Sequence, residues 1–401
     1  MYFIPLLVII IIWLPLLFFM RWRYYRMPLL PKDDIAKEGN EALPITVIIP
    51  LDHDADGLYE LLASIFNQHY DGSVHVLIAN YSGDKAIEDK LLRIERDFRN
   101  LKHTNITTTP HIIDKEKLAV SVALKGARTE WVMLMDVDVN LPSPNWLRAM
   151  TEACKSDYDI IVGYSNYVVS KATTTLWQYD VHFQNIQAYS QGCYTGGVLH
   201  HVLIRKSHFL NQMGYSNRHM RLTIGTLPLL VDYLSRTGRA CVSLCSDTSV
   251  FKTQASANGM HQESLAHNII YYYSALKTKI LDTLYSISTC FLLTLPLLLL
   301  YTILQNVMLW VRHFGSEMML SSYTLIPNSP MIWEVALHTL IVIALLATLC
   351  IPLRWLQKSF TVVGLQITYP KLLIYPFLLP FYRTNKRILA FFYRKKCVRR
   401  L

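Results

Sequence analysis

The chain has 401 residues, of which 52% are hydrophobic and 12% aromatic, so it can build one large domain or two small ones. Its seven cysteines show neither the spacing of zinc or redox motifs nor a disulfide framework, which excludes those classes of site. The formal net charge of +10 comes mainly from the C-terminal tail. Because apolar segments precede this tail, membrane lipids are its expected partner and nucleic acid is not.

Three uncharged apolar segments predict three transmembrane helices. They lie within residues 2–20, 283–311 and 335–353, and each is long enough to cross a bilayer. Basic residues follow the first segment and fill the tail, so the positive-inside rule places the chain between the first two segments in the cytoplasm. A transporter is excluded, because the segments carry almost no charge and show no inverted repeat. We assign residues 1–21 to an N-terminal anchor, 280–312 and 331–353 to two further membrane helices, and 360–401 to a basic interfacial tail, in a multi-pass protein of the inner membrane.

Strands and helices alternate between the first two apolar segments. The apolar patterns predict strands at 45–50, 74–80, 104–109 and 131–135, with helices at 57–68, 85–98 and 115–127. This alternation predicts an α/β fold with a mostly parallel sheet. The region from 159 to 255 is less regular and predicts short strands, followed by a helix at 226–237.

Two aspartates end the most apolar strand, in the stretch "WVMLMDVDVNLPSPNW" at residues 131–146. Side chains of a strand alternate between its faces, so Asp136 and Asp138 point to the same side. Two adjacent carboxylates resist joint ionisation unless a cation or hydrogen bonds compensate them. In open α/β sheets, ligands bind beyond the carboxyl ends of the strands. The pair therefore predicts either a cation-binding site at this edge or a solvated turn.

Three segments resemble membrane-anchored bacterial glycosyltransferases of family 2, which have the GT-A fold. They read "VIIPLDHD", "KLAVSVALKGARTEWVMLMDVDVNLPSPNWLRAM" and "GYSNYVVSKATTTLWQYDVHFQNIQA". The resemblance extends from about residue 44 to 275. It implies a Rossmann-like, mostly parallel GT-A domain in the cytoplasm, joined to the three membrane helices. It also implies an inverting enzyme that moves a sugar from a nucleotide-sugar donor to a lipid-linked or cell-envelope glycan acceptor.

The resemblance implies roles for five residues. Asp54 would contact the nucleotide base, and Asn80 stands where the family has a nucleotide-binding aspartate. Asp136 would lie near the sugar nucleotide, and Lys117 would be a further donor contact unless it is a solvated helix lysine. Asp138 would bind Mg²⁺ or Mn²⁺, which offsets the charge that develops on the departing diphosphate.

The chain departs from the family at the general base, the group that accepts the acceptor's proton. The family has an acidic cluster here, whereas this chain reads "RLTIGTLPLLVDYLSRTG", with Thr-Leu-Pro at 226–228 after Gly225. Asp232, more than a helical turn further on, is only a weak candidate, and a solvated or capping role explains it better. His219, His261 or a phosphate of the acceptor are the other candidates.

Two hypotheses follow from this departure. The first is an active transferase with an unusual base, which the retained Asp136 and Asp138 favour. The second is a non-catalytic relative that serves as a partner or glycan-binding subunit, which the loss of the acidic cluster favours.

Overall fold

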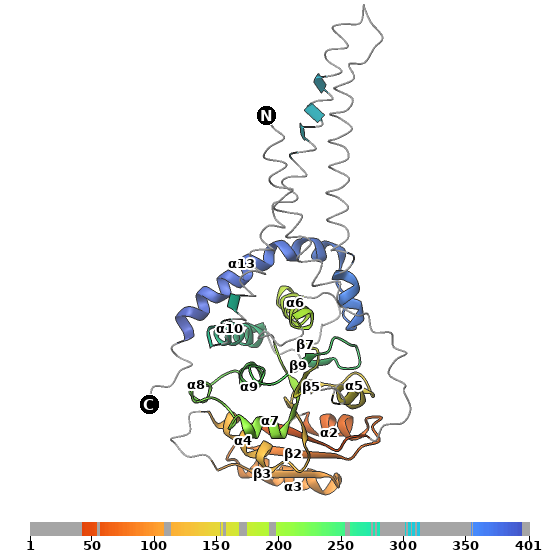
Figure 1. Ribbon diagram of the computed structural model, residues 1–401, viewed down its shortest axis with the longest axis vertical. Helices are drawn as coiled ribbons and strands as arrows, with labels where there is room; N and C mark the ends of the chain where they lie inside the picture. Colours follow the sequence, from red (N-terminus) through yellow and green to blue (C-terminus); the bar gives the residue numbers. More distant parts are fainter. Residues whose placement is uncertain are drawn as a thin grey trace, which may run out of the picture.

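The structure, a computed structural model, describes the chain from residue 42 to residue 394 with gaps. The described residues are 42–53, 57–107, 114–152, 154, 158–167, 175–191, 198–252, 257–273, 276, 279–280, 301, 304–305, 307–308, 311–312, 354 and 356–394. Figure 1 shows their arrangement.

A seven-stranded mixed sheet is the centre of the fold, with strand order β3-β2-β1-β4-β8-β6-β9. Its strands are β1 (Ile45–Leu51), β2 (Val74–Asn80), β3 (Leu101–Asn105), β4 (Trp131–Met135), β6 (Ile160–Val162), β8 (His201–Arg205) and β9 (Ala240–Val242). Only the pairings of β8 with β4 and β6 are antiparallel. As a result, the start of β8 lies at the edge where β1 and β4 end.

A smaller sheet lies beside this edge. It consists of β5 (Val139–Asn140), β10 (Val250–Lys252) and β7 (Ser165–Tyr167), with β10 in the middle. β5 follows Asp138 directly and pairs with β10, so residues more than 100 positions apart in the sequence meet here.

Helices cover both faces of the main sheet. The labelled helices of the structure are α2 (Leu58–Phe66), α3 (Lys85–Asp97), α4 (Lys115–Gly126), α5 (Trp146–Glu152), α6 (Leu176–Gln191), α7 (Lys206–Asn211), α8 (Asn217–Met220), α9 (Thr226–Leu234), α10 (Ala257–Tyr273) and α13 (Tyr369–Tyr393). Side chains of α2, α3 and α5 belong to the hydrophobic cluster on one face, and those of α4, α7 and α9 to the cluster on the other.

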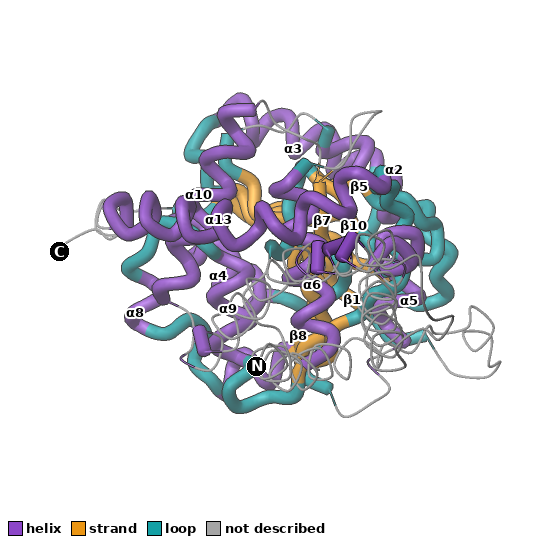
Figure 2. The backbone as a smooth tube through the Cα atoms, turned by 90° about the horizontal axis from the view of Figure 1, so that it is seen from above, coloured by secondary structure: helices purple, strands orange, loops and turns teal. Residues whose placement is uncertain are grey.

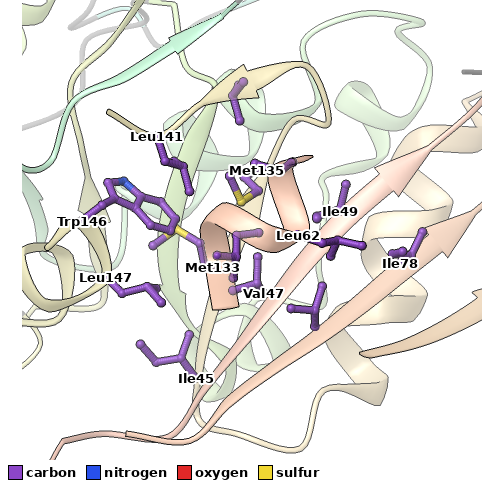
Figure 3. Packing of buried hydrophobic residues seen from close by; sticks show 14 of the residues in the cluster. Ile45, Val47, Ile49, Leu62, Ile78, Met133, Met135, Leu141, Trp146 and Leu147 are labelled. Carbon is purple, nitrogen blue, oxygen red and sulfur yellow. The ribbon is translucent and has the colours of Figure 1, made fainter. Parts of the chain in front are cut away.

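The alternation of side chains along β1 explains why both faces are buried. Ile45, Val47 and Ile49 belong to one cluster, and Ile48 belongs to the other. In Figure 3 the first set packs against Leu62 of α2 and against Met133 and Met135 of β4. A strand buried on both faces has a nearly continuous apolar sequence, as "ITVIIPL" does.

Among the described elements, α13 lies on the side of α10 and α6, with α3 on the opposite side (Figure 1), and it runs beside α10 in the view from above (Figure 2). Its residues Leu372 and Leu379 join a third cluster with Tyr179 of α6. A buried ion pair fixes the contact: Arg383 of α13 donates from its Nε to Oδ1 of Asp180 on α6, at 2.6 Å. Both side chains are almost fully buried.

The structure corrects the expected fold class, an α/β domain with three transmembrane helices. It is an α/β fold with a mixed sheet, and among the described residues no helix combines the length and hydropathy needed to cross a bilayer. An uncharged run of 19 residues permits a membrane span but does not require one. The longest described helix, α13, is interrupted by basic residues such as Lys371, Arg383 and Lys386. The segments assigned to the three helices, 1–21, 280–312 and 331–353, lie almost entirely outside the described residues.

Candidate functional site

The candidate site lies where β1 and β4 end. From β1 the chain continues to β2 on one side and later to β4 on the other, so the strand order reverses between β1 and β4. Such a switch point leaves a crevice at the carboxyl ends of the strands, where ligands bind in open α/β sheets. Asp136 and Asp138 follow β4 at this point, as the sequence pattern predicts.

Asp136 is held by the residue that precedes β8. Its backbone N–H donates to the carbonyl oxygen of His200 at 3.0 Å, and its Oδ2 lies 2.9 Å from Nδ1 of the same residue. The His200 side chain is only 6% exposed, and its Nε2 is buried and makes no hydrogen bond within the described residues. The ring of Tyr167 packs edge-on against the imidazole. Asp136 is therefore fixed in orientation by a partner on a different strand.

Asp138 pairs with a lysine of the smaller sheet. The Nζ atom of Lys252 lies 3.1 Å from Oδ2 of Asp138 and 3.0 Å from Oε1 of Glu263, on α10. The Lys252 side chain is 18% exposed, whereas that of Asp138 is 47% exposed. Although burial opposes it, the carboxylates of Asp136, Asp138 and Glu263 raise the pKa of this ammonium. Lys252 is thus protonated at neutral pH and ties the two sheets to α10.

The charges around Lys252 fit a divalent cation shared with a substrate. Three carboxylates, those of Asp136, Asp138 and Glu263, act on this single ammonium, so the cluster has an excess of negative charge. No group of three or more metal-ligating side chains occurs among the described residues, so they form no protein cage. Mg²⁺ usually binds through one or two carboxylates together with substrate phosphates and needs no such cage. The half-exposed Asp138 is the carboxylate best placed to contribute.

Asn80 and Lys117 are both engaged within the protein. The Nδ2 of Asn80, at the end of β2, donates to Oδ1 of Asn105 at 2.8 Å, and its Oδ1 accepts from the Ser82 hydroxyl at 2.7 Å. The Lys117 side chain is fully buried, and its ammonium donates to Asp114 and to two backbone carbonyls. A nucleotide contact by Lys117 stays a prediction that requires the exchange of one of these partners. Asp54 lies outside the described residues.

Asp232 lies in a basic environment on α9. Its Oδ2 accepts from the guanidinium of Arg236 at 2.7 Å, and its charge acts on His219, whose pKa burial lowers to about 4. It is not among the main charges that shift the pKa of Lys252 and Glu116, two of the groups on which Asp136 acts. The structure therefore groups Asp232 with His219 and not with the aspartates after β4. The side chain of His261, like Asp54, is outside the description.

The sequence patterns missed four residues of this site: Glu116, His200, Lys252 and Glu263. None of them belongs to a motif with the two aspartates. The antiparallel course of β8 brings in His200, and the pairing of β10 with β5 brings in Lys252. The sequence held one signal that such partners exist, and it was chemical: the paired carboxylates Asp136 and Asp138 require compensating charge or hydrogen bonds.

The sequence matches no protein-family model and no curated protein. Among solved structures, the chain is similar to a mannosyltransferase, PcManGT from Pyrobaculum calidifontis in complex with GDP-Man and Mn²⁺, at 14% identity and a TM-score of 0.47, with 85% of this chain and 96% of that chain covered. It is also similar to S. aureus TarS 1–349, at 14% identity and a TM-score of 0.39, with 88% and 90% covered. At these TM-scores the similarities carry no inference about activity.

Proposed function

We propose that this protein is a glycosyltransferase that uses a nucleotide-sugar donor. The observation that carries the proposal is the placement of Asp136 and Asp138 after β4, at the strand-order reversal and beside the ammonium of Lys252. A partly exposed aspartate fixed by His200 and a half-exposed one next to a cation form a polar site that suits a diphosphate with its counter-ion. The sequence resemblance to family 2 supports the inverting type.

In this proposal Asp138 holds Mg²⁺ or Mn²⁺ with the donor's diphosphate. The ion would stabilise the negative charge that develops as the nucleoside diphosphate leaves. Asp136, whose position His200 fixes, would orient the sugar nucleotide. Lys252 adds a second positive charge that does not depend on pH near neutrality. Asn80, at the end of β2, and Asp54 remain predicted contacts of the nucleotide.

The acceptor is proposed to be a lipid-linked or cell-envelope glycan at the cytoplasmic face of the inner membrane. The resemblance to family 2 supports this, and so does α13, which exposes apolar side chains beside basic ones. Membrane lipids would contact this helix and the basic residues after it. This location brings the donor site close to an acceptor that is itself anchored in lipid.

The test is the thermal stability of the purified protein with UDP, GDP and their sugars, with and without Mn²⁺. We expect one nucleotide to raise Tm only when metal is present, because binding to the native state alone stabilises it. Asp138→Ala should remove this shift, whereas Asp89→Ala, an exposed change on α3, should retain it.

The absence of a shift with every nucleotide would contradict the proposal. It would favour the alternative of a non-catalytic subunit that binds a partner or a glycan, since the acidic cluster expected at 226–228 is missing.

A further inference from the structure

The first turn of α4 brings an unexpected carboxylate to the candidate site. Asp114 caps this helix by accepting from the N–H of Lys117 at 3.0 Å, which fixes the turn that contains Glu116. The Lys117 ammonium donates to the carbonyl oxygens of Leu222 at 2.7 Å and Ile224 at 3.0 Å. These bonds tie the start of α4 to the loop that leads into α9. Glu116 is therefore held at a fixed place between two helix N-termini.

Glu116 lies among groups from five parts of the chain. Burial, followed by the charges of Asp136 and Asp114, raises the pKa of its carboxyl to about 7, while Thr226 and Lys117 lower it. Glu116 in turn raises the pKa of Tyr81 and of Tyr215, so both phenols also face it. The titratable, charged and hydroxyl groups around it are therefore Asp114, Lys117, Asp136, Thr226, Tyr81 and Tyr215.

Thr226 stands where the resemblance to family 2 requires an acid. It is the first residue of α9, after Gly225 in a left-handed conformation, and its hydroxyl is buried next to the Glu116 carboxyl, whose pKa it lowers. The next carboxylate on α9, Asp232, is paired with Arg236 instead. Glu116 of α4 thus places a carboxylate beside Thr226, the position at which α9 itself has no acid.

We infer that Glu116 is the general base of the transfer, an inference that rests on the proposed function. An Oε atom of Glu116 takes the proton of the acceptor hydroxyl as that oxygen bonds to the anomeric carbon of the sugar. The bond from the anomeric carbon to the diphosphate oxygen breaks, and the nucleoside diphosphate leaves with that electron pair. Glu116 ends the step protonated and returns its proton to solvent.

The raised pKa of the Glu116 carboxyl suits the role of a general base. A base is most effective when its pKa lies near the working pH, and the ordinary glutamate value is well below neutrality. Asp136, one of the two aspartates that raise the pKa of Glu116, also belongs to the proposed donor site. The base and the donor site are consequently coupled by charge.

The experiment compares the wild-type chain with Glu116→Gln and Glu116→Asp. Water serves as the acceptor, and the readout is nucleoside diphosphate released from the donor that stabilises the wild type. We expect Glu116→Gln to lower this rate by about 10² to 10⁴-fold, the usual contribution of a general base, while the donor still raises Tm. Glu116→Asp should retain part of the rate. Glu60→Gln, a matched change in the first turn of α2 at an exposed side chain, should leave it unchanged.

The pH dependence separates a base from a structural residue. The wild-type rate should rise with pH to a plateau, with a midpoint near 7, and the residual rate of Glu116→Gln should lack this midpoint. Because the folded-state pKa is raised, the contribution of Glu116 to stability should be fully present below the ordinary glutamate value and be lost as pH rises through about 7. Glu116→Gln should therefore increase Tm by a few degrees at pH 8 and leave it unchanged at pH 4.

Two results would overturn the inference, and they differ. If Glu116→Gln releases nucleoside diphosphate at the wild-type rate with donor binding intact, Glu116 is not the base, although the proposed function stands. If no nucleotide sugar stabilises the wild type, the proposed function fails and the assignment of the base fails with it.

Discussion

Lys252 joins three carboxylates that two separate elements bring to the site. Asp136 and Asp138 come from the end of β4, and Glu263 comes from α10. Their combined charge outweighs the cost of burying the ammonium, which is why its pKa is raised and not lowered. The stability of this region should accordingly depend on the ionisation of its acids.

Replacing Lys252 with methionine should expose this dependence. At pH 7.5 the change leaves Asp138 and Glu263 without their shared cation, and we expect a loss of about 1–2 kcal/mol, since the partly exposed carboxylates are screened by solvent.

Denaturant unfolding of the wild type and the variant at pH 7.5 measures this loss. Lys102→Met is the control, because that ammonium pairs with Glu95 at the surface and should contribute under about 1 kcal/mol. A loss for Lys252→Met no larger than that for Lys102→Met would show that its charge is not what stabilises the region.

The sequence could reveal only those site residues that lie next to one another. Asp136 and Asp138 follow an apolar strand with the period of two that gives them one direction, and the structure places both at the strand end. His200 lies 64 positions after Asp136, and its contact depends on the antiparallel docking of β8. Propensity and periodicity contain no information about such long-range pairing, and no motif marks it.

At the level of elements, periodicity identified the first half of the domain well. The strands predicted at 45–50, 74–80 and 131–135 correspond to β1, β2 and β4, because each is buried enough to need an apolar sequence. The strand expected at 104–109 is found instead at Leu101–Asn105, where Leu101 is the only fully buried residue. An edge strand of this kind has little hydrophobic signal to fix its limits.

The helices that pack together at the α13 end were the hardest to foresee. α6 buries polar side chains, including Gln178, Asp180 and Asn185, so its sequence has no clear apolar stripe. α13 contains several prolines, which disfavour a helix interior, yet it runs continuously from Tyr369 to Tyr393. Its contacts with α6 and α10 stabilise a helix that its sequence alone does not favour.

Asp180 offers a test of how α13 is attached. Asp180→Ala leaves the Arg383 guanidinium buried without its partner, and we expect a loss of about 3–5 kcal/mol of stability. Replacing both residues, as Asp180→Ala with Arg383→Met, removes the isolated charge and should recover much of that loss. Denaturant unfolding of the wild type, both single variants and the double variant gives the coupling energy. A double variant whose loss equals the sum of the two single losses would contradict this view of the contact.

At the level of the whole molecule, the two ends differ in character. α13 exposes apolar side chains along its length, whereas α3, at the other end in Figure 1, is charged. The exposed apolar residues of α13 are Tyr369, Ile374, Leu378, Phe381, Ile388, Phe391, Phe392 and Tyr393. With Lys371 and Arg394 nearby, this surface has the composition of helices that lie in a lipid headgroup layer.

Binding to vesicles should depend on the basic residues that follow this helix. Replacing Lys395, Lys396, Arg399 and Arg400 with glutamine should weaken sedimentation with phosphatidylserine-containing vesicles, by about 1 kcal/mol for each charge removed. Binding to neutral phosphatidylcholine vesicles should change little.

The matched control replaces four basic residues of α3, Lys85, Lys90, Arg93 and Arg96, at the opposite end of the molecule. These changes remove the same net charge and should leave sedimentation as it is. If both variants lose binding equally, total charge and not the α13 end governs the interaction with lipid.

The reversed direction of β8 has a consequence for how the protein is made. Asp136 leaves the ribosome 64 residues before His200, so at ordinary rates of synthesis roughly 3 to 13 s pass before its partner is available. During that interval β4 is an open edge beside β1, and the nascent chain has no finished crevice. The candidate site is thus assembled late, after β1, β2 and β3 have had time to pair.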